Sequence, residues 1–218
     1  MKNKVIHIFY TKQTAILDEN IFQQFLLQLP PFLQKEIKAY KHRESAQASL
    51  FGKMLLLYGF KIMNTDYLLS NIQLGNKDRP FIDDNLDFNV SHSGEYIIIA
   101  ITRNSKVGID IEKHRNLNIG LFKKYFDDGE WNAIQTSQNK LKTFFDFWTI
   151  KESAIKCDGR GVEVLSKTQI LKQKVNCDGV SFDYIQLYIE DGYSCAVCST
   201  NNFIVKSTPV FLDDFLQL

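Results

Sequence analysis

The 218-residue sequence has no long apolar segment. Its longest uninterrupted apolar run, Tyr96–Ile101, is 6 residues, whereas a helix needs about 20 apolar residues to cross a bilayer. The apolar stretch near the start of the chain breaks at Thr11 and Lys12, too early for the core of a secretion signal. These two absences predict a cytoplasmic protein that has no contact with a membrane.

The sequence also lacks an excess of charge. It has 26 basic and 25 acidic residues, for a net charge of +1. Proteins that bind nucleic acid non-specifically normally present a broad basic surface. Nucleic acid is therefore not an expected partner, and any anionic ligand must be met by a local cluster of residues.

Cysteine is scarce, and the 4 cysteines offer no obvious metal site. Cys195 and Cys198 form a lone Cys-x-x-Cys in a segment whose pattern is typical of a strand. Residues three apart on a strand face opposite sides of the sheet. We therefore expect these thiols to pack in the core, and a shared metal or a redox pair is the less favoured alternative.

No linker rich in glycine, serine or proline divides the chain, while 17 Phe and 9 Tyr supply ample core material. Hydrophobic periodicity predicts helices at 18–29, 31–60, from 131, and 140–157. It predicts strands at 2–10, 87–101 (a hairpin), 106–112, 168–175, 181–190 and 193–199. Because a helix, a loop and a strand pair recur, we predict an α+β fold of two similar halves, 1–105 and 106–218.

Two carboxylates lie on one face of the strand predicted at 106–112. Alternation along the strand turns its apolar residues toward the core and places Asp110 and Glu112 together on the other face. Their Cα atoms would be about 6–7 Å apart, so the two charges repel unless a cation lies between them. Mg²⁺ prefers such oxygen ligands. A solvated strand face is the alternative interpretation.

The helix predicted at 140–157 carries charges on an apolar stripe. Trp148, Glu152 and Lys156 are spaced by four residues and share one face, which Phe144 continues. Charges on a buried face need partners. A metal for Glu152 and a phosphate for Lys156 would supply them; an ordinary Glu–Lys pair at the edge of the stripe is the alternative.

Polar and basic segments upstream offer contacts for an anion. Asn89–Gly94 has two hydroxyls and an imidazole at the predicted tip of the hairpin, and Arg43 and Arg79 are the nearest candidate cations. Each of these features is also common in polar turns and on solvated surfaces, so alone none of them defines a site.

Together, these segments resemble the Sfp-type 4′-phosphopantetheinyl transferase family. The strand Gly-Ile-Asp-Ile-Glu at 108–112 and the helix Trp-Thr-Ile-Lys-Glu-Ser-Ala-Ile-Lys at 148–156 match its two signature blocks. Their spacing, 41 residues from Asp110 to Lys151, is that of the family. Asn-Val-Ser-His-Ser at 89–93 resembles a third block.

The resemblance implies a fold and a reaction. The fold would be a pseudo-dimer of two α+β halves with the active site between them, and the protein would be a monomer. Coenzyme A would be the donor, Mg²⁺ the cofactor, and a serine of an acyl or peptidyl carrier protein the acceptor. The products would be the holo-carrier and 3′,5′-ADP.

The resemblance also implies roles for individual residues. Three carboxylates would bind Mg²⁺: Asp110, Glu112 and Glu152. Six residues would contact coenzyme A: Arg43, Arg79, Ser91, His92, Lys151 and Lys156. Of these, the two lysines would contact phosphates, Ser91 and His92 the nucleotide end with its 3′-phosphate, and Arg79 the adenine. One departure is Gln47-Ala48-Ser49, where family members often have an arginine that grips coenzyme A.

Phosphoryl transfer requires a base for the acceptor serine and positive charge for the leaving group. We expect Glu152 to be the base and Lys156 to offset charge on 3′,5′-ADP. Residues 113–126 are basic and apolar, and we expect them to dock the carrier, although simple packing explains their apolar residues equally well. Two other functions fit the same carboxylates: a Mg²⁺-dependent phosphohydrolase or nuclease, and a catalytically silent module that binds carrier proteins.

Overall fold

The computed structural model describes residues 4–75, 77 and 79–218. The helices are α1 (Glu19–Leu27), α2 (Pro31–Lys38), α3 (Arg43–Ile62), α4 (Asp128–Thr136), α5 (Lys140–Asp158) and α6 (Leu212–Phe215), with short 3₁₀ turns η1 (Leu69–Asn71), η3 (Ile119–Tyr125) and η4 (Val162–Lys167). The strands are β1 (Lys4–Lys12), β2 (Gln73–Leu74), β3 (Pro80–Phe81), β4 (Leu86–Ser93), β5 (Tyr96–Arg103), β6 (Val107–Lys113), β7 (Thr168–Ile170), β8 (Lys174–Cys177), β9 (Val180–Leu187), β10 (Tyr193–Ser199) and β11 (Phe203–Pro209).

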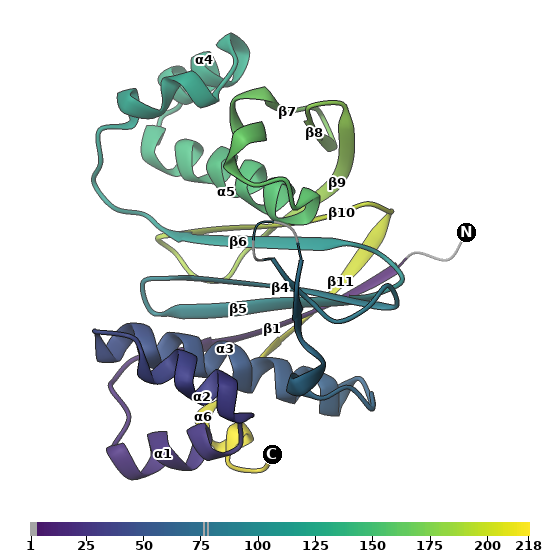
Figure 1. Ribbon diagram of the computed structural model, residues 1–218. Coiled ribbons are helices and arrows are strands. Elements are labelled where there is room, and N and C mark those ends of the chain that lie inside the picture. Colours follow the sequence, from purple (N-terminus) through teal and green to yellow (C-terminus); the bar gives the residue numbers. More distant parts are fainter. Residues whose placement is uncertain (1–3, 76, 78) are drawn as a thin grey trace.

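Two main sheets are packed between two long helices (Figure 1). The first sheet has the order β11-β1-β5-β4 and the second the order β6-β10-β9-β8-β7. Helix α3 covers one face of the first sheet, and α5 covers one face of the second. The other two faces meet in a core that includes Ile8, Ile98, Ile109 and Val197. The predicted α+β fold of two similar halves is confirmed.

The helix boundaries follow local chemistry. The side chain of Asp18 accepts the Asn20 amide at the start of α1, and Pro31 occupies the first turn of α2, where its missing N–H is not needed. Asp127 and Glu130 form a capping box at the start of α4, which begins at Asp128 rather than at the expected Trp131. The prediction of a single helix at 31–60 is wrong, because α2 ends at Lys38 and α3 begins only at Arg43.

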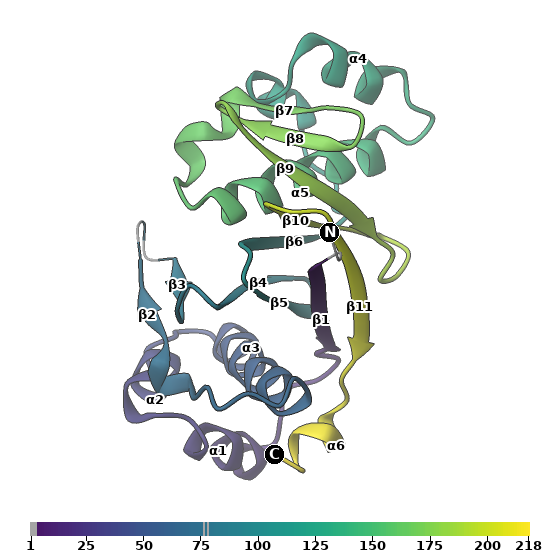
Figure 2. The same cartoon turned by 90° about the vertical axis from the view of Figure 1, so that its right-hand side faces the viewer.

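The end of the chain returns to the first half (Figure 2). Strand β11, which the sequence did not predict, pairs in parallel with β1. Helix α6 then places Phe215 against Phe25 and Phe51, in the core beneath α3. The division of the chain at residue 105 stays a prediction; β11 and α6 follow it in sequence but pair and pack with elements of the first half.

The two sheets are joined along β4 and β6 by side chains instead of a backbone ladder. Four alternate residues of β4 accept backbone N–H groups of β6: Asp87 from Val107 (2.8 Å), Asn89 from Ile109 (2.9 Å), Ser91 from Ile111 (3.3 Å) and Ser93 from Lys113 (3.0 Å). Alternate residues share one face of a strand, so one polar face of β4 satisfies the free edge of β6. We call these four hydrogen bonds the seam and each of them a rung. The seam fixes the register of β6 against the first half.

Removing one rung of the seam should destabilise the fold. We expect Asn89→Ala to lower the free energy of unfolding by about 1–3 kcal/mol, because it leaves the buried Ile109 amide without an acceptor. Urea denaturation measures the change, and Asn132→Ala on the exposed surface of α4 is the control. An Asn89→Ala midpoint equal to that of the wild type would show that the rung contributes nothing.

Candidate active site

Gly108 allows α5 to lie directly on β6. A Cβ atom at this position would fall well inside the contact distance of two backbone atoms of α5, the Ser153 carbonyl oxygen and the Cys157 nitrogen. Backbone atoms cannot move aside as a flexible side chain can, so only glycine fits. This close approach brings Glu152 and Lys156 of α5 over the face of β6 that carries the carboxylates.

Asp110 is the buried centre of the site, with 5% of its surface exposed. Its Oδ1 accepts hydrogen bonds from Ser91 Oγ (2.9 Å) and from Lys156 Nζ (2.6 Å). Its Oδ2 is buried and has no hydrogen-bond partner among the described residues. Burial raises the pKa of Asp110, and the nearby Lys156 charge opposes that rise. The free oxygen is a polar atom that needs a ligand.

Glu112 and Glu152 complete a cluster of three carboxylates. Glu112 Oε2 accepts from Ser93 Oγ (2.9 Å) and Arg115 Nη1 (2.8 Å). Glu152 makes no hydrogen bond or ion pair with the described residues. Its pKa is raised to about 7, first by burial and then by the charges of Asp110 and Glu112, while Lys156 opposes the rise. The charges of the three side chains thus act on one another, and their role as Mg²⁺ ligands stays a prediction.

The donor set of this cluster fits a divalent cation. In the described part of the chain no three acidic, histidine or cysteine side chains are arranged to hold a metal ion as they stand, and the Lys156 ammonium pairs with Asp110. The three groups nevertheless offer only oxygen atoms, which Mg²⁺ prefers. They repel one another, and one buried oxygen of Asp110 has no hydrogen-bond partner within residues 4–75, 77 and 79–218. A cation would satisfy both requirements.

The segment at 89–93 differs from its predicted form. Ser91, His92 and Ser93 belong to β4, and the turn of the hairpin lies at Gly94 and Glu95. Ser91 is buried at the seam, whereas His92 is exposed. The pKa of His92 is lowered, first by desolvation and then by the Lys156 charge, and the Glu112 charge opposes the shift.

Lys151 does not enter the site, which corrects the predicted phosphate contact. It is fully buried, pairs with Glu130 at 2.8 Å and donates to the Thr168 carbonyl oxygen. Glu130 in turn accepts the Ile170 amide at 2.8 Å. Desolvation lowers the pKa of Lys151, and Glu130 opposes this. The pair ties α5 to α4 and β7, on the side of α5 away from Asp110.

Arg79 lies at the seam with its hydrogen-bond donors already used. Nε donates to the Lys156 carbonyl oxygen (2.9 Å), and Nη1 and Nη2 donate to the two oxygens of Asp87 (2.8 and 2.7 Å). Nη2 also donates to the Val107 carbonyl oxygen (2.9 Å). A hydrogen bond to adenine through these donors is therefore not available.

Arg43 and Gln47 serve the N-terminal helices. Arg43 pairs with Glu19 at 2.9 Å, and its guanidinium lies 3.4 Å from the centre of the Phe22 ring. Gln47 is fully buried and binds the backbone of the segment before α1, accepting from the Leu17 amide (2.7 Å) and donating to the Ala15 carbonyl (2.8 Å). Contact of Arg43 with coenzyme A stays a prediction.

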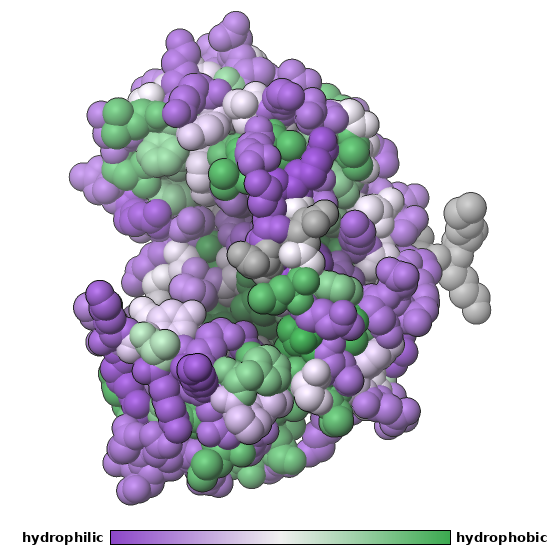
Figure 3. Space-filling model, viewed as in Figure 1, coloured by the Kyte–Doolittle hydropathy of each residue, from purple (hydrophilic) through white to green (hydrophobic). Residues whose placement is uncertain are grey.

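The surface is hollowed where the two halves meet (Figure 3). One cavity of about 990 Å³ lies at the C-terminal end of α5, and Arg79, Phe81, Asp87 and Lys106 are among its lining residues. The cavity is lined by Asp87 of the seam but by none of the three carboxylates. We therefore assign the chemistry to the carboxylate cluster and not to the cavity.

Sequence reasoning missed several residues of the site. Asp87 and Ser93 hold β6, and Glu130 neutralises Lys151. The signal for the first two was present: polar residues alternate at 87, 89, 91 and 93 with apolar ones, in a strand that leads into the signature block. The predicted core packing of Cys195 and Cys198 is confirmed, since both are free and buried in different clusters.

Comparisons with known proteins cover both halves. Residues 106–198 match the family described as the 4′-phosphopantetheinyl transferase superfamily, and residues 18–104 match the one described as 4′-phosphopantetheinyl transferase, N-terminal.

None of the helices in the described residues has the length and apolar character that a membrane crossing requires.

Similar proteins share this pattern over most of the chain. The 4′-phosphopantetheinyl transferase gsp of Aneurinibacillus migulanus is 29% identical, covering 89% of this chain and 86% of its own. The 4′-phosphopantetheinyl transferase Sfp of Bacillus subtilis is 28% identical, covering 90% and 92%. A putative 4′-phosphopantetheinyl transferase of Haemophilus influenzae is 32% identical, covering 72% of each.

Proposed function

Because the chain belongs to the 4′-phosphopantetheinyl transferase family, we propose that it transfers 4′-phosphopantetheine from coenzyme A to a serine of an acyl or peptidyl carrier protein. One observation carries the proposal. A buried carboxylate oxygen of Asp110, which has no hydrogen-bond partner in the part of the chain that the structure describes, belongs to a group that includes Lys156 and two further carboxylates, Glu112 and Glu152. Such a cluster suits a cation and the diphosphate of coenzyme A.

Mg²⁺ would be held by Asp110, Glu112 and Glu152. When bound, it would neutralise charge on the diphosphate, which is the main requirement of phosphoryl transfer. The residues of the chain would supply the rest. Lys156 has its ammonium group partly exposed at the cluster, where it can turn from Asp110 to a phosphate oxygen of the leaving 3′,5′-ADP.

Glu152 is the group best suited to accept the serine proton. With a pKa of about 7, a large fraction of its carboxylate is ionised at neutral pH, yet it is basic enough to take a proton. The serine oxygen would form a bond to the β-phosphorus of coenzyme A while the bond from that phosphorus to 3′,5′-ADP breaks. The serine proton would pass to Glu152.

Product analysis tests this reaction. Chromatography should detect one 3′,5′-ADP released for each carrier modified, and no release with a carrier whose acceptor serine is replaced by alanine. Release of 3′,5′-ADP without a carrier would instead favour the phosphohydrolase interpretation. Carrier binding without any release would favour the silent binding module. We further propose a monomer, since two similar halves already pair within one chain.

The carrier surface is proposed to include η3. Leu121 is 72% exposed, and Lys123 and Lys124 are exposed beside it. Phe122 packs against Phe144 and Trp148 instead, so the packing interpretation holds for that ring. An exposed apolar side chain with two exposed cations in the same short turn suits a carrier with acidic residues around its serine.

Reversing the charges of Lys123 and Lys124 should weaken binding of the carrier and leave binding of coenzyme A unchanged. We expect Lys123→Glu with Lys124→Glu to raise the KM for the carrier several-fold and to leave the KM for coenzyme A unchanged. The effect should shrink at high salt, because exposed charges are screened over about 10 Å at 0.1 M. Lys35→Glu with Lys38→Glu, two exposed lysines in the last turn of α2, is the matched control. An unaltered carrier KM at low salt would remove η3 from the docking surface.

A further inference from the structure

Two hydroxyl groups of β4 each contact a carboxylate of β6. Ser91 Oγ donates to Asp110 Oδ1, and Ser93 Oγ donates to Glu112 Oε2, both at 2.9 Å. Each hydroxyl also accepts the next backbone amide of β6, Ile111 for Ser91 (3.3 Å) and Lys113 for Ser93 (3.0 Å). The same arrangement therefore occurs twice, two residues apart on both strands.

This arrangement fixes the direction of each hydroxyl proton. A serine hydroxyl has one proton and two lone pairs. Since a backbone N–H can only donate, it occupies a lone pair of the serine oxygen. At Ser91 the second lone pair faces Lys156 Nζ, at 3.1 Å. The single proton of each serine is therefore left for the carboxylate.

Each carboxylate consequently has one oxygen held and one free. At Asp110, Oδ1 is held by Ser91, and Oδ2 has no partner among the described residues. At Glu112, Oε2 is held by Ser93 and by Arg115. Its Oε1 makes no hydrogen bond with any described residue. The hydroxyls thus select which oxygen of each carboxylate is offered to a ligand.

We propose that Ser93, together with Ser91, is a positioning residue that orients these two carboxylates for a divalent cation. The inference rests on the proposed function, in which Asp110 and Glu112 bind Mg²⁺. Partners that orient metal ligands typically contribute 10–100-fold to metal affinity. Ser93 is the cleaner test of the two, because Ser91 also contacts Lys156 and carries a predicted contact with coenzyme A.

Binding of Mn²⁺, followed by electron paramagnetic resonance without a carrier, tests the role. The titration is made with and without coenzyme A, and Mg²⁺ competition shows that both ions share the site. We expect Ser93→Ala to weaken Mn²⁺ binding about 10–100-fold, and Ser93→Thr, which keeps the hydroxyl, to restore it. If Ser93→Ala fails to fold, Ser93→Cys keeps the volume with a much weaker donor.

Asn89→Ala is the matched control, because Asn89 forms another rung of the same seam but touches no carboxylate. A purely structural role predicts that both alanine variants lose stability and keep wild-type affinity for Mn²⁺. Wild-type affinity in Ser93→Ala, or an equal loss in Asn89→Ala, would overturn the positioning role. A wild-type protein that binds no Mn²⁺ under either condition would overturn the proposed cation chemistry itself.

Discussion

Replacing Asp110 by asparagine is expected to abolish transfer while the fold persists. Asparagine has the same size, and its amide oxygen can still accept the Ser91 hydroxyl. It lacks the negative charge that the proposed cation needs. Charge stabilisation by a bound metal ion contributes several kcal/mol to such reactions, so the expected loss of kcat/KM is about 10³-fold or more.

The stability of this variant should stay level or rise when no metal is present. Burial raises the pKa of Asp110, and repulsion by Glu112 adds to the rise. A carboxyl group with a raised pKa in the folded state costs stability at pH values above its ordinary pKa. Thermal unfolding in EDTA at pH 7 measures this, with Asp66→Asn on the surface as the control. Full activity with an unchanged dependence on Mg²⁺ would contradict the assigned role.

Replacing Glu152 by glutamine is expected to keep coenzyme A binding and to lower kcat by about 10²–10⁴-fold, the usual contribution of a general base. Burial and the charges of Asp110 and Glu112 raise the pKa of Glu152 to about 7 in the metal-free protein. A bound Mg²⁺ would lower it, so the wild-type rate at saturating Mg²⁺ should rise with pH through a midpoint below 7. In the variant that rise should be absent. Rates at saturating coenzyme A and Mg²⁺, between pH 5.5 and 8.5, provide the comparison.

The same substitution should stabilise the metal-free protein at neutral pH. The raised pKa of Glu152 means that its charged form is disfavoured in the folded state, so its cost appears as pH rises above the ordinary value of 4.5 and is complete near pH 7. After allowance for its partial exposure, we expect a gain of about 1–3 kcal/mol at pH 8 and none at pH 4. Near-normal turnover of Glu152→Gln would assign the base to another group.

The parts of the fold that could be predicted have strong local signals. Helix α5 has an amphipathic stripe and a glycine with left-handed backbone at its end, Gly159 (φ 83°). Strand β6 alternates apolar and polar residues, so the common face of Asp110 and Glu112 follows from its period. Strand β11 was missed because it pairs with β1, about 200 residues away in sequence, and no local pattern reports such a partner.

Side-chain partners were the least predictable part of the site. Lys151 follows Ile150 on α5 and faces Glu130, so it is buried, although its neighbours suggest a phosphate-binding lysine. Arg79 was expected to bind a ligand, yet Asp87 and two carbonyl oxygens occupy its donors. The partners of Lys151 and of Arg79 lie mostly on other segments of the chain. The sequence alone does not specify which acidic residue a buried cation will contact.

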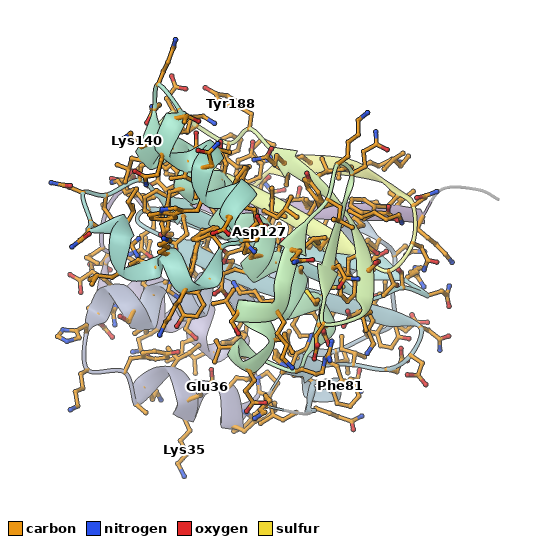
Figure 4. The ribbon with its side chains drawn as sticks, turned by 90° about the horizontal axis from the view of Figure 1, so that it is seen from above. Lys35, Glu36, Phe81, Asp127, Lys140 and Tyr188 are labelled. Atoms are coloured by element: carbon orange, nitrogen blue, oxygen red, sulfur yellow. The ribbon has the colours of Figure 1, made fainter. Side chains whose placement is uncertain are left out.

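The loop between β9 and β10 carries Tyr188, which is 81% exposed, on the far side of the view from Phe81 (Figure 4). The two residues belong to opposite halves of the chain. Neither enters the proposed chemistry, which depends on the seam between β4 and β6 and on the helix above it.

The most direct test of the central claim is the intact mass of a carrier protein after incubation with this chain, coenzyme A and Mg²⁺. The account predicts a mass increase equal to one 4′-phosphopantetheine on the acceptor serine. It predicts no increase with EDTA or with Asp110→Asn. An unmodified mass for apo-carriers of both the acyl and the peptidyl type, with wild-type protein that is folded and supplied with Mg²⁺, would contradict it.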